Sequence, residues 1–328
     1  MINNAVVQIL QAEKKFNVKI IFPFVTFIIA WLLHHVLPDA GNVLTEPSAY
    51  PVFLTSLILL YLFWVAVSFA APKLLSGFLQ RAPIFAAVFL ILALWDLVTL
   101  KLRLVPLPFF PEPGRVLAVY LSDWEMLGTS LLHSLRLQFT GYFIGAALGL
   151  LAGIGMGWSK KIGYWFTPLV KILGPIPATA WIPVALTIFP TSFSASVFLV
   201  AMAVWFPVTI MSSSGIAGVP NAYFDVARTL GADNRFLIFK VAIPAALPLI
   251  FIGLFMGLTT SFLALIVAEM LGVKAGLGWY ISWAQSWAEY DKVYAVLIII
   301  SFVFSSLITI LFKIRDRVLV WQKGVVKW

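Results

Sequence analysis

The sequence predicts an all-α, polytopic membrane protein, and three observations support this fold class. Of the 328 residues, 62% are hydrophobic and only 11% are charged, and the mean hydropathy is +1.02. A soluble chain carries about a quarter of its residues charged. Apolar runs of the length that a helix needs to cross a bilayer, about 20 residues, recur along the chain. Lysine and arginine are concentrated in alternate segments between these runs, which is the distribution expected of cytoplasmic loops.

Eight apolar runs bounded by charge or proline are the predicted membrane spans. They are Ile20 to Leu37, Pro51 to Pro72, Pro83 to Leu100, Leu131 to Trp158, Tyr164 to Phe189, Ser194 to Gly215, Ala245 to Leu271, and Val293 to Phe312. The fifth run is the least regular, because Lys171 and three prolines interrupt it. The first run is too long for the apolar core of a signal peptide and no small-x-small cleavage site follows it, so it is predicted to be a retained helix.

The distribution of basic residues predicts the orientation of these spans. An even number of spans places both termini on one side, and cytoplasmic loops carry the excess of lysine and arginine. The segments predicted to be inner hold fifteen of the 22 basic residues: Lys14, Lys15, Lys19, Lys73, Arg81, Lys160, Lys161, Arg228, Arg235, Lys240, Lys313, Arg315, Arg317, Lys323 and Lys327. The outer segments hold five, namely Lys101, Arg103, Arg115, Lys274 and Lys292. Both termini are therefore predicted to be cytoplasmic.

Composition also excludes several classes of function. The chain has no cysteine, which excludes disulfides and cysteine-ligated zinc or iron-sulfur centres, and its three histidines are too few for a haem or a di-metal centre. No metal site is expected. The net charge of +9 is explained by topology rather than by nucleic acid, so no nucleic-acid partner is expected. No Gly-x4-Gly-Lys-Ser/Thr loop is present, so this chain is not expected to hold ATP or to be an enzyme.

Glycine recurs at every fourth position of the fourth predicted span. The residues are Gly141, Gly145, Gly149, Gly153 and Gly157. This spacing lines one face of a helix with hydrogen atoms, so another helix can approach closely. We interpret the ridge as a helix-packing surface and not as a substrate site.

The long inner loop, residues 217–244, has the pattern helix, break, helix. Asn221 is a predicted N-cap, Gly231 a left-handed terminator, and Asp233 the cap of a second short helix that ends before Pro244. On that second helix the apolar residues Phe236, Phe239 and Ile243 recur at helical spacing. Such an exposed amphipathic pair needs a partner for its apolar side, which is either the lipid interface or another protein.

The same loop carries a resemblance to a known family. Asp225-Val226-Ala227, then Gly231, then Val241-Ala242-Ile243-Pro244 has the spacing of the "EAA" loop of bacterial ABC importer permeases, Glu-Ala-Ala, x3, Gly, x9, Ile-x-Leu-Pro. Ala227, Gly231 and Pro244 match outright, whereas Asp225 stands for Glu and Val226 for Ala. Further segments resemble the nitrate, sulfonate and taurine branch: Phe110-Pro111-Glu112-Pro113, Ser130 to Leu135, Ile176-Pro177, Trp181-Ile182-Pro183, Ile266 to Glu269, and Gly276-Leu277-Gly278.

The resemblance implies a type I ABC importer permease (MetI-like) core of six helices, with two additional N-terminal transmembrane helices. The implied divisions are residues 1–82 for the extension, 83–130 for the first core helix and outer loop, 131–316 for the transport domain with its coupling loop at 217–244, and 317–328 for a cytoplasmic tail. Asp225, Ala227, Gly231 and Pro244 would form the contact with the ATPase.

The resemblance also implies partners and a location. The chain would be a permease subunit in a bacterial inner membrane, functioning as a dimer of identical chains. Cytoplasmic ATPase subunits would bind the ATP and Mg²⁺, and a periplasmic or lipoprotein binding protein would deliver a small solute of the nitrate, sulfonate and taurine class. Membrane lipid would surround the spans, and this chain would hold no cofactor.

Four Asp, Glu, Lys or Arg residues lie inside predicted spans, where charge is costly and often functional. Asp96 is interpreted as an interfacial acid that snorkels to water, and Lys171 as part of an interfacial kink. Arg136 could attract an anion or contact lipid headgroups. Glu269, at a position where the resembled branch also carries Glu, has either a pathway or gate role or a role at the helix end.

The sequence favours the importer over two other functional classes. An ion-coupled secondary transporter should show inverted halves with broken spans in corresponding positions, and the sequence has no such symmetry. A membrane enzyme such as a lipid transferase should carry an acidic or histidine cluster. Asp96, Glu269 and the pair His34-His35 are instead scattered over separate spans.

Overall fold

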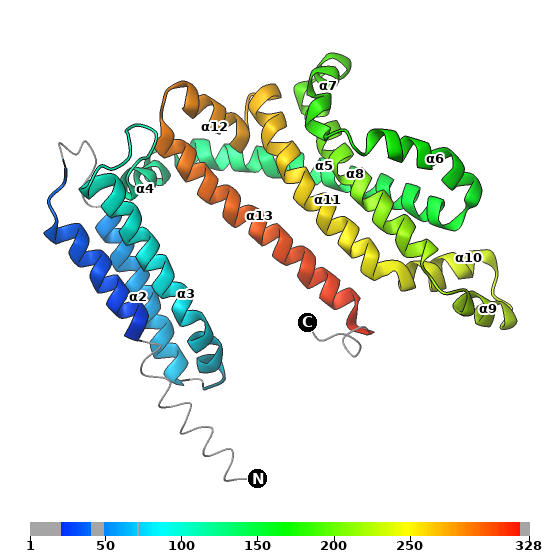
Figure 1. Cartoon of the computed structure of the whole chain (residues 1–328), viewed down its shortest axis with the longest axis horizontal. Helices are drawn as coiled ribbons and strands as arrows, with labels where there is room; N and C mark the ends of the chain where they lie inside the picture. Colours follow the sequence, from blue (N-terminus) through cyan, green and yellow to red (C-terminus); the bar gives the residue numbers. More distant parts are fainter. Residues whose placement is uncertain (1–20, 41–48, 71, 322–328) are drawn as a thin grey trace, which may run out of the picture. The chain divides into compact units, whose positions relative to one another are not determined.

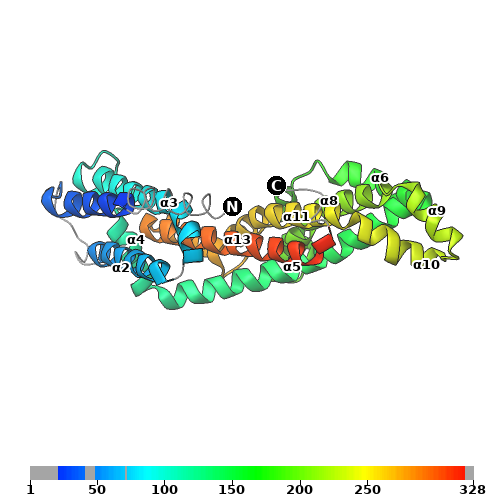
Figure 2. The ribbon, with the colours of Figure 1, turned by 90° about the horizontal axis from the view of Figure 1, so that it is seen from below.

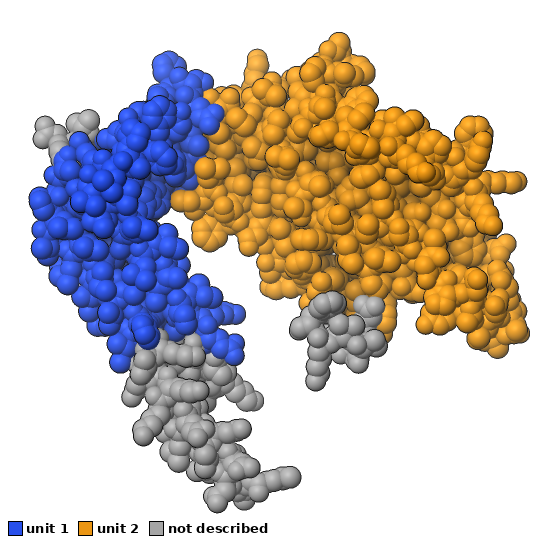
Figure 3. All heavy atoms as spheres, in the orientation of Figure 1, with its two compact units in different colours: residues 1–124, 284–295 blue, residues 125–283, 296–328 orange. Residues whose placement is uncertain are grey.

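The structure is a computed structural model that describes residues 21–40, 49–70 and 72–321 (Figure 1). Every regular element in these residues is helical, which confirms the predicted all-α class. The chain divides into two compact units, one of residues 1–124 with 284–295 and one of residues 125–283 with 296–328 (Figure 3). Lys14, Lys15, Lys19, Lys323 and Lys327 lie outside the described residues.

The first unit holds the N-terminal helices. They are the helix Ile21–Val36, α2 (Ala49–Ala70), α3 (Pro72–Asp96) with the π-helical extension η1 (Leu97–Lys101), and α4 (Pro113–Ser122). Its core forms where Tyr50 and Leu54 of α2 pack against Phe89 of α3. Residues 284–295 belong to this unit, and the Tyr120 hydroxyl of α4 donates to the Ala295 carbonyl at 2.9 Å.

Asp96 is buried, so the interpretation of a snorkelling acid is wrong. Its side chain is 3% exposed and its Oδ2 lies 2.9 Å from Nδ1 of His34, on the helix Ile21–Val36. Because α3 packs beside that helix, the histidine replaces water as the polar partner of the carboxylate. Two of the ionisable groups that looked scattered in the sequence therefore meet.

The second unit holds most of the remaining helices. They are α5 (Trp124–Trp158), α6 (Lys160–Leu173), η2 (Ala178–Trp181), α7 (Ile182–Ile188), α8 (Ser192–Ala217), α9 (Asn221–Thr229), α10 (Asn234–Phe236), η3 (Leu237–Ala242), α11 (Ile243–Gly272), α12 (Leu277–Ser286) and α13 (Tyr290–Val318). Residues 284–295, at the end of α12 and the start of α13, belong to the first unit. The helices α8 and α11 lie side by side along their length, as both views show (Figures 1 and 2).

Among the described residues, six helices are long and apolar enough to cross a membrane, and a seventh span results if α6 and the η2–α7 segment are counted as one. These two segments are bent by 86°, so the fifth predicted span is not a continuous helix. Pro175 and Pro177 lack the N–H groups that a helix needs, which explains the break. The first predicted span corresponds to the shorter apolar helix Ile21–Val36, and Ile20 lies outside the described residues.

Two helix boundaries also differ from prediction. The fourth span begins at Trp124 rather than at Leu131, because a new helix starts directly after α4 ends at Ser122. The second helix of the inner loop does not end before Pro244. It continues from α10 through the π-helical η3 into α11, with Pro244 in the first turn of α11, where a missing N–H costs little.

Candidate functional site

The inner loop forms an elbow, defined here as α9, the turn 230–233 and α10. Asn221 is the first helical residue rather than the cap, and Pro220 occupies the N-cap position without a side-chain hydrogen bond. The helix ends where Gly231 adopts a left-handed φ of +85°, and the Ala232 N–H donates to the Ala227 carbonyl at 3.0 Å. A left-handed residue at this position is the usual device for ending a helix, and glycine adopts it without strain.

The other side of the elbow is fixed by a capping interaction. The Asp233 carboxylate accepts a hydrogen bond from the Phe236 N–H at 2.8 Å, which starts α10. The base of α9 is anchored because Ala227 is buried and the Phe224 ring packs edge-on against Trp158, with 5.7 Å between ring centroids. The elbow is thus a defined structure and not a flexible loop tip.

The outer face of the elbow is apolar and exposed. Its exposed side chains are Tyr223, Val226, Leu230 and Phe236, with Leu230 82% exposed, and Phe239 of the following η3 is exposed as well. Asp225 is also exposed, 3.4 Å from the Arg228 guanidinium. An exposed apolar patch bordered by charge is the composition of a protein-docking surface.

The glycine ridge of α5 lies against α8. A Cβ added at any of its five glycines would come within 2.8 Å of an atom of α8. At Gly145 it would overlap the Ala201 carbonyl oxygen, and at Gly153 it would lie 2.6 Å from the Thr209 carbonyl oxygen. The two backbones therefore approach so closely that only glycine fits, which is the packing mode of small-residue ridges in membranes.

Glu269 is fully buried and bonded to two other helices. Its carboxylate accepts from the Ser134 hydroxyl, at 2.7 and 2.9 Å from the two oxygens, and from the Gly278 N–H at 2.9 Å. The Ser134 oxygen in turn accepts from the Leu277 N–H at 2.8 Å. Glu269 of α11 and Ser134 of α5 together hold the N-terminus of α12, where an acid is favoured by the unpaired N–H groups.

Sequence reasoning missed Ser134 and the buried pair of Gln138 and Ser261, whose side chains are 2.7 Å apart. A signal for them was available. Gln138 lies three residues before Gly141, and Ser134 lies four residues before Gln138, so both continue the face of the ridge. Polar residues on a packed face in a membrane usually bond across to another helix.

The structure does not bring the other charged candidates to this buried site. Arg136 is exposed on α5, with its guanidinium 5.1 Å from the centroid of the Phe193 ring. Lys171 is exposed on α6. In the part of the chain that the structure describes, no group of three or more His, Cys, Asp or Glu residues could hold a metal ion.

Comparison with known families gives one match that covers more than half of the chain. The model of the family described as "Binding-protein-dependent transport system inner membrane component" matches residues 145–319. This region begins on the glycine ridge and includes the elbow, Glu269 and all of α13.

Three relatives carry related names. A protein of Methanocaldococcus jannaschii, named as an ABC transporter permease, is 32% identical over 50% of this chain and 63% of its own length. The nitrate import permease protein NrtB of Synechococcus elongatus is 30% identical over 44% of this chain and 50% of its own. The bicarbonate transport system permease protein CmpB of the same species is 34% identical over 34% of this chain and 41% of its own. The chain thus matches about half the length of these curated relatives.

A solved structure supports the fold. A chain of the inward-facing MetNI methionine ABC transporter superposes with a TM-score of 0.50 at 19% sequence identity, covering 59% of this chain and 96% of that one. At this identity the likeness concerns the fold alone, which agrees with the predicted type I permease core.

Proposed function

Because the chain belongs to the family of binding-protein-dependent transport system inner membrane components, we propose that it is the membrane-spanning permease subunit of an ATP-driven importer. The elbow carries this proposal. It is an apolar and exposed projection between α8 and α11, two paired helices of spanning length. Such a projection transmits a movement of a bound partner directly to the two helices.

The partner at the elbow is a cytoplasmic ATPase subunit, which binds the ATP and Mg²⁺. The chain has no phosphate-binding loop of its own, so the energy has to come from another subunit. Asp225, Ala227 and Gly231 define the contact and its geometry, and Pro244 begins the helix that leads from the contact into the membrane. This chain performs no covalent chemistry.

The substrate is a small solute that a periplasmic or lipoprotein binding protein delivers, and the names of two relatives, for nitrate and bicarbonate, favour an anion. Two copies of the chain form the membrane part in a plasma (inner) membrane, with both termini in the cytoplasm and lipid around the spans. ATP binding closes the ATPase pair, the elbows move with it, and the helices alternate between outward and inward access.

The first test is a mild-detergent purification of the tagged chain from its native membrane, with mass spectrometry of the accompanying proteins and an ATP hydrolysis assay. We expect an ATPase subunit near one-to-one with the chain. Recovery of the chain alone and without ATPase activity, under conditions that preserve other membrane complexes, would reject this function and direct attention to ion-coupled transport.

A matched pair of variants locates the contact. Leu230→Asp places a charge on the apolar face of the elbow, where Leu230 is 82% exposed, and should remove most of the co-purifying ATPase. Leu121→Asp makes the same change on α4, where Leu121 is 73% exposed outside the elbow, and should leave the recovery unchanged. Equal recovery from both variants would exclude the elbow as the contact.

A further inference from the structure

The break between α6 and η2 lies beside the middle of α8, a helix of spanning length. Gly174 follows the end of α6 and packs against the Phe206 ring, and Phe206 lies near the middle of the 26-residue spanning helix α8. A side chain at Gly174 would overlap that ring, so the chain passes close to α8 at this point. The irregular backbone of the break therefore lies near the middle of α8, far from the water at either end of this spanning helix.

The backbone of the break is short of hydrogen-bond partners. Pro175 and Pro177 have no N–H to donate. Among the described residues, no backbone N–H donates to the carbonyls of Gly174, Pro175 or Ile176. Pro175, Ile176 and Pro177 are nevertheless exposed on the chain. Irregular backbone at membrane depth is tolerated only where protein buries it or where it lines a water-filled cavity, so this exposed face does not face lipid.

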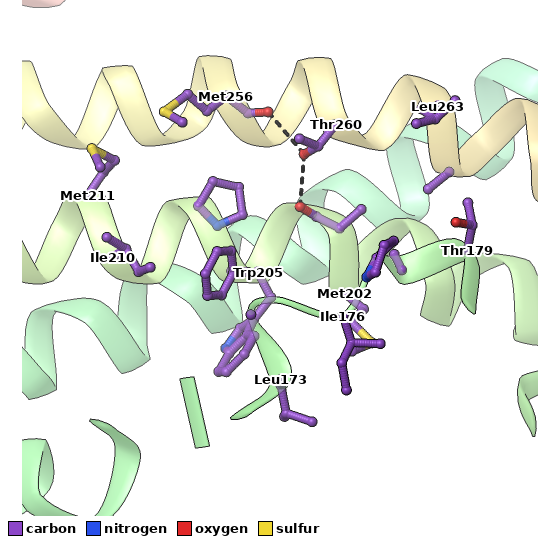
Figure 4. A pocket seen from close by; sticks show the side chains of 17 residues that line it. Leu173, Ile176, Thr179, Met202, Trp205, Ile210, Met211, Met256, Thr260 and Leu263 are labelled. Carbon is purple, nitrogen blue, oxygen red and sulfur yellow. Dashed lines mark hydrogen bonds between the residues drawn. The ribbon is translucent and has the colours of Figure 1, made fainter. Parts of the chain in front are cut away.

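A cavity of about 340 Å³ adjoins the break (Figure 4). The break contributes Ile176 and Thr179, α8 contributes Met202 and Trp205, and α11 contributes Thr260. The Thr260 hydroxyl is already bonded to the Ala203 and Met256 carbonyls, at 2.9 and 3.0 Å. No charged side chain is among the residues that line the cavity. The polar groups left to contact a solute are the Thr179 hydroxyl, the Trp205 indole N–H and backbone carbonyls.

We propose that this cavity, the break cavity, is part of the solute route at the membrane midplane and recognises the solute by hydrogen bonds rather than by charge. The inference rests on the proposed importer function and narrows its substrate class. Carbonyl oxygens only accept hydrogen bonds, the Trp205 indole N–H only donates and the Thr179 hydroxyl does both, so the cavity favours a small polar solute that carries donors, acceptors and some apolar surface. Among small anions, those that carry both donors and acceptors fit it better than those that only accept. Selection by charge then takes place before the solute reaches the midplane.

The absence of cysteine from the chain makes a direct test possible. Ile176→Cys and Thr179→Cys each place a single thiol at the break cavity, and Phe302→Cys places one on the middle of α13, where Phe302 is 71% exposed and outside the cavity. Each variant is treated in native membranes with membrane-impermeant methanethiosulfonate reagents, one cationic and one anionic. A thiol reacts as the thiolate, which forms in contact with water and not in lipid.

We expect both cavity thiols to react and the Phe302→Cys thiol to remain unmodified. After normalisation to a free thiol in solution, the two reagents should react at rates within about threefold of each other. A positive charge about 8 Å from the thiol would favour the anionic reagent by more than about tenfold at an effective dielectric constant of about 20. Such a preference would overturn recognition without charge.

Unreactive thiols at both positions, in membranes whose complex hydrolyses ATP, would overturn the solute route itself. Thr179→Cys is close to isosteric, so it decides the question if Ile176→Cys does not assemble. The two proposals fail separately. A missing ATPase in the purification overturns the importer, whereas unreactive cavity thiols in a complex that contains the ATPase overturn only the break cavity as a route.

Discussion

The hydroxyl of Ser134 lies 2.7 Å from a carboxylate oxygen of Glu269, and both side chains are buried. The two residues are 135 positions apart in the chain and come from α5 and α11. The carboxylate also accepts a hydrogen bond from the Gly278 N–H, and the Ser134 oxygen accepts one from the Leu277 N–H. These four polar groups therefore join three helices, α5, α11 and α12. Glu269 is therefore a structural tie in this conformation, and a gate role would require that the tie opens.

Ser134→Ala should destabilise the protein because it leaves the Leu277 N–H without a partner and the buried carboxylate with only the Gly278 N–H as a donor. An unsatisfied buried group costs about 1–3 kcal/mol, so we expect a lower midpoint of thermal unfolding, followed by tryptophan fluorescence in detergent. Ser196→Ala is the matched control, because Ser196 is also buried but its hydroxyl has no hydrogen-bond partner among the described residues. Similar midpoints for the two variants would contradict the tie.

Gly145→Ala and Gly128→Ala should change stability in opposite directions, although both lie on α5. A Cβ at Gly145 would overlap the Ala201 carbonyl oxygen, so α5 and α8 have to separate, and overpacking of this kind costs about 1–3 kcal/mol. No atom lies within 4 Å of a Cβ at Gly128, so alanine there gains about 0.5–1 kcal/mol of helix propensity. Thermal unfolding of the purified variants measures both shifts, and a stabilised Gly145→Ala would exclude the close approach.

The spans and the elbow were largely predictable because they depend on local signals. Six of the eight predicted runs correspond to long spanning helices, since the length and hydropathy of a run decide whether it crosses a membrane. The end of α9 at Gly231 and the cap at Asp233 follow from the preferences of single residues. The glycine spacing predicts a packed face, but it does not say that α8 is the helix that meets it.

The remaining features depend on tertiary contacts that a hydropathy pattern does not contain. Asp96 looked interfacial because it ends an apolar run, yet its partner His34 is 62 residues away in the chain. The break after Leu173 falls within the apolar run that is predicted to be the fifth span, and only Lys171 and the prolines of this run indicate it in the sequence. Asn221 was predicted to be the cap because asparagine favours that position, whereas the helix begins after Pro220, where the chain leaves α8.

Gly231→Val should separate folding from coupling. Valine in the left-handed region costs about 1–2 kcal/mol, so the turn between α9 and α10 has to change its shape, although the space around Gly231 is open. We expect a protein that still inserts into the membrane but loses most of the co-purifying ATPase and its transport. Gly231→Asn is the control, since asparagine adopts this conformation more readily than valine. Normal transport by the valine variant would reject the coupling assignment.

The predicted orientation of the chain can be measured independently of any partner. Fifteen of the 22 basic residues lie in the predicted inner segments. This bias predicts that the segments 73–81, 160–161, 228–240 and 313–317 are cytoplasmic. Fusion of green fluorescent protein to either end should give fluorescence, and fusion of alkaline phosphatase should give no activity, because the first folds in the cytoplasm and the second only outside it. A phosphatase fusion after Arg103, in the predicted outer loop, is the control and should be active.

Activity from a fusion at only one terminus would show that the number of crossings is odd. The helix Ile21–Val36 and the bent pair α6–α7 would then be the first segments to reassign.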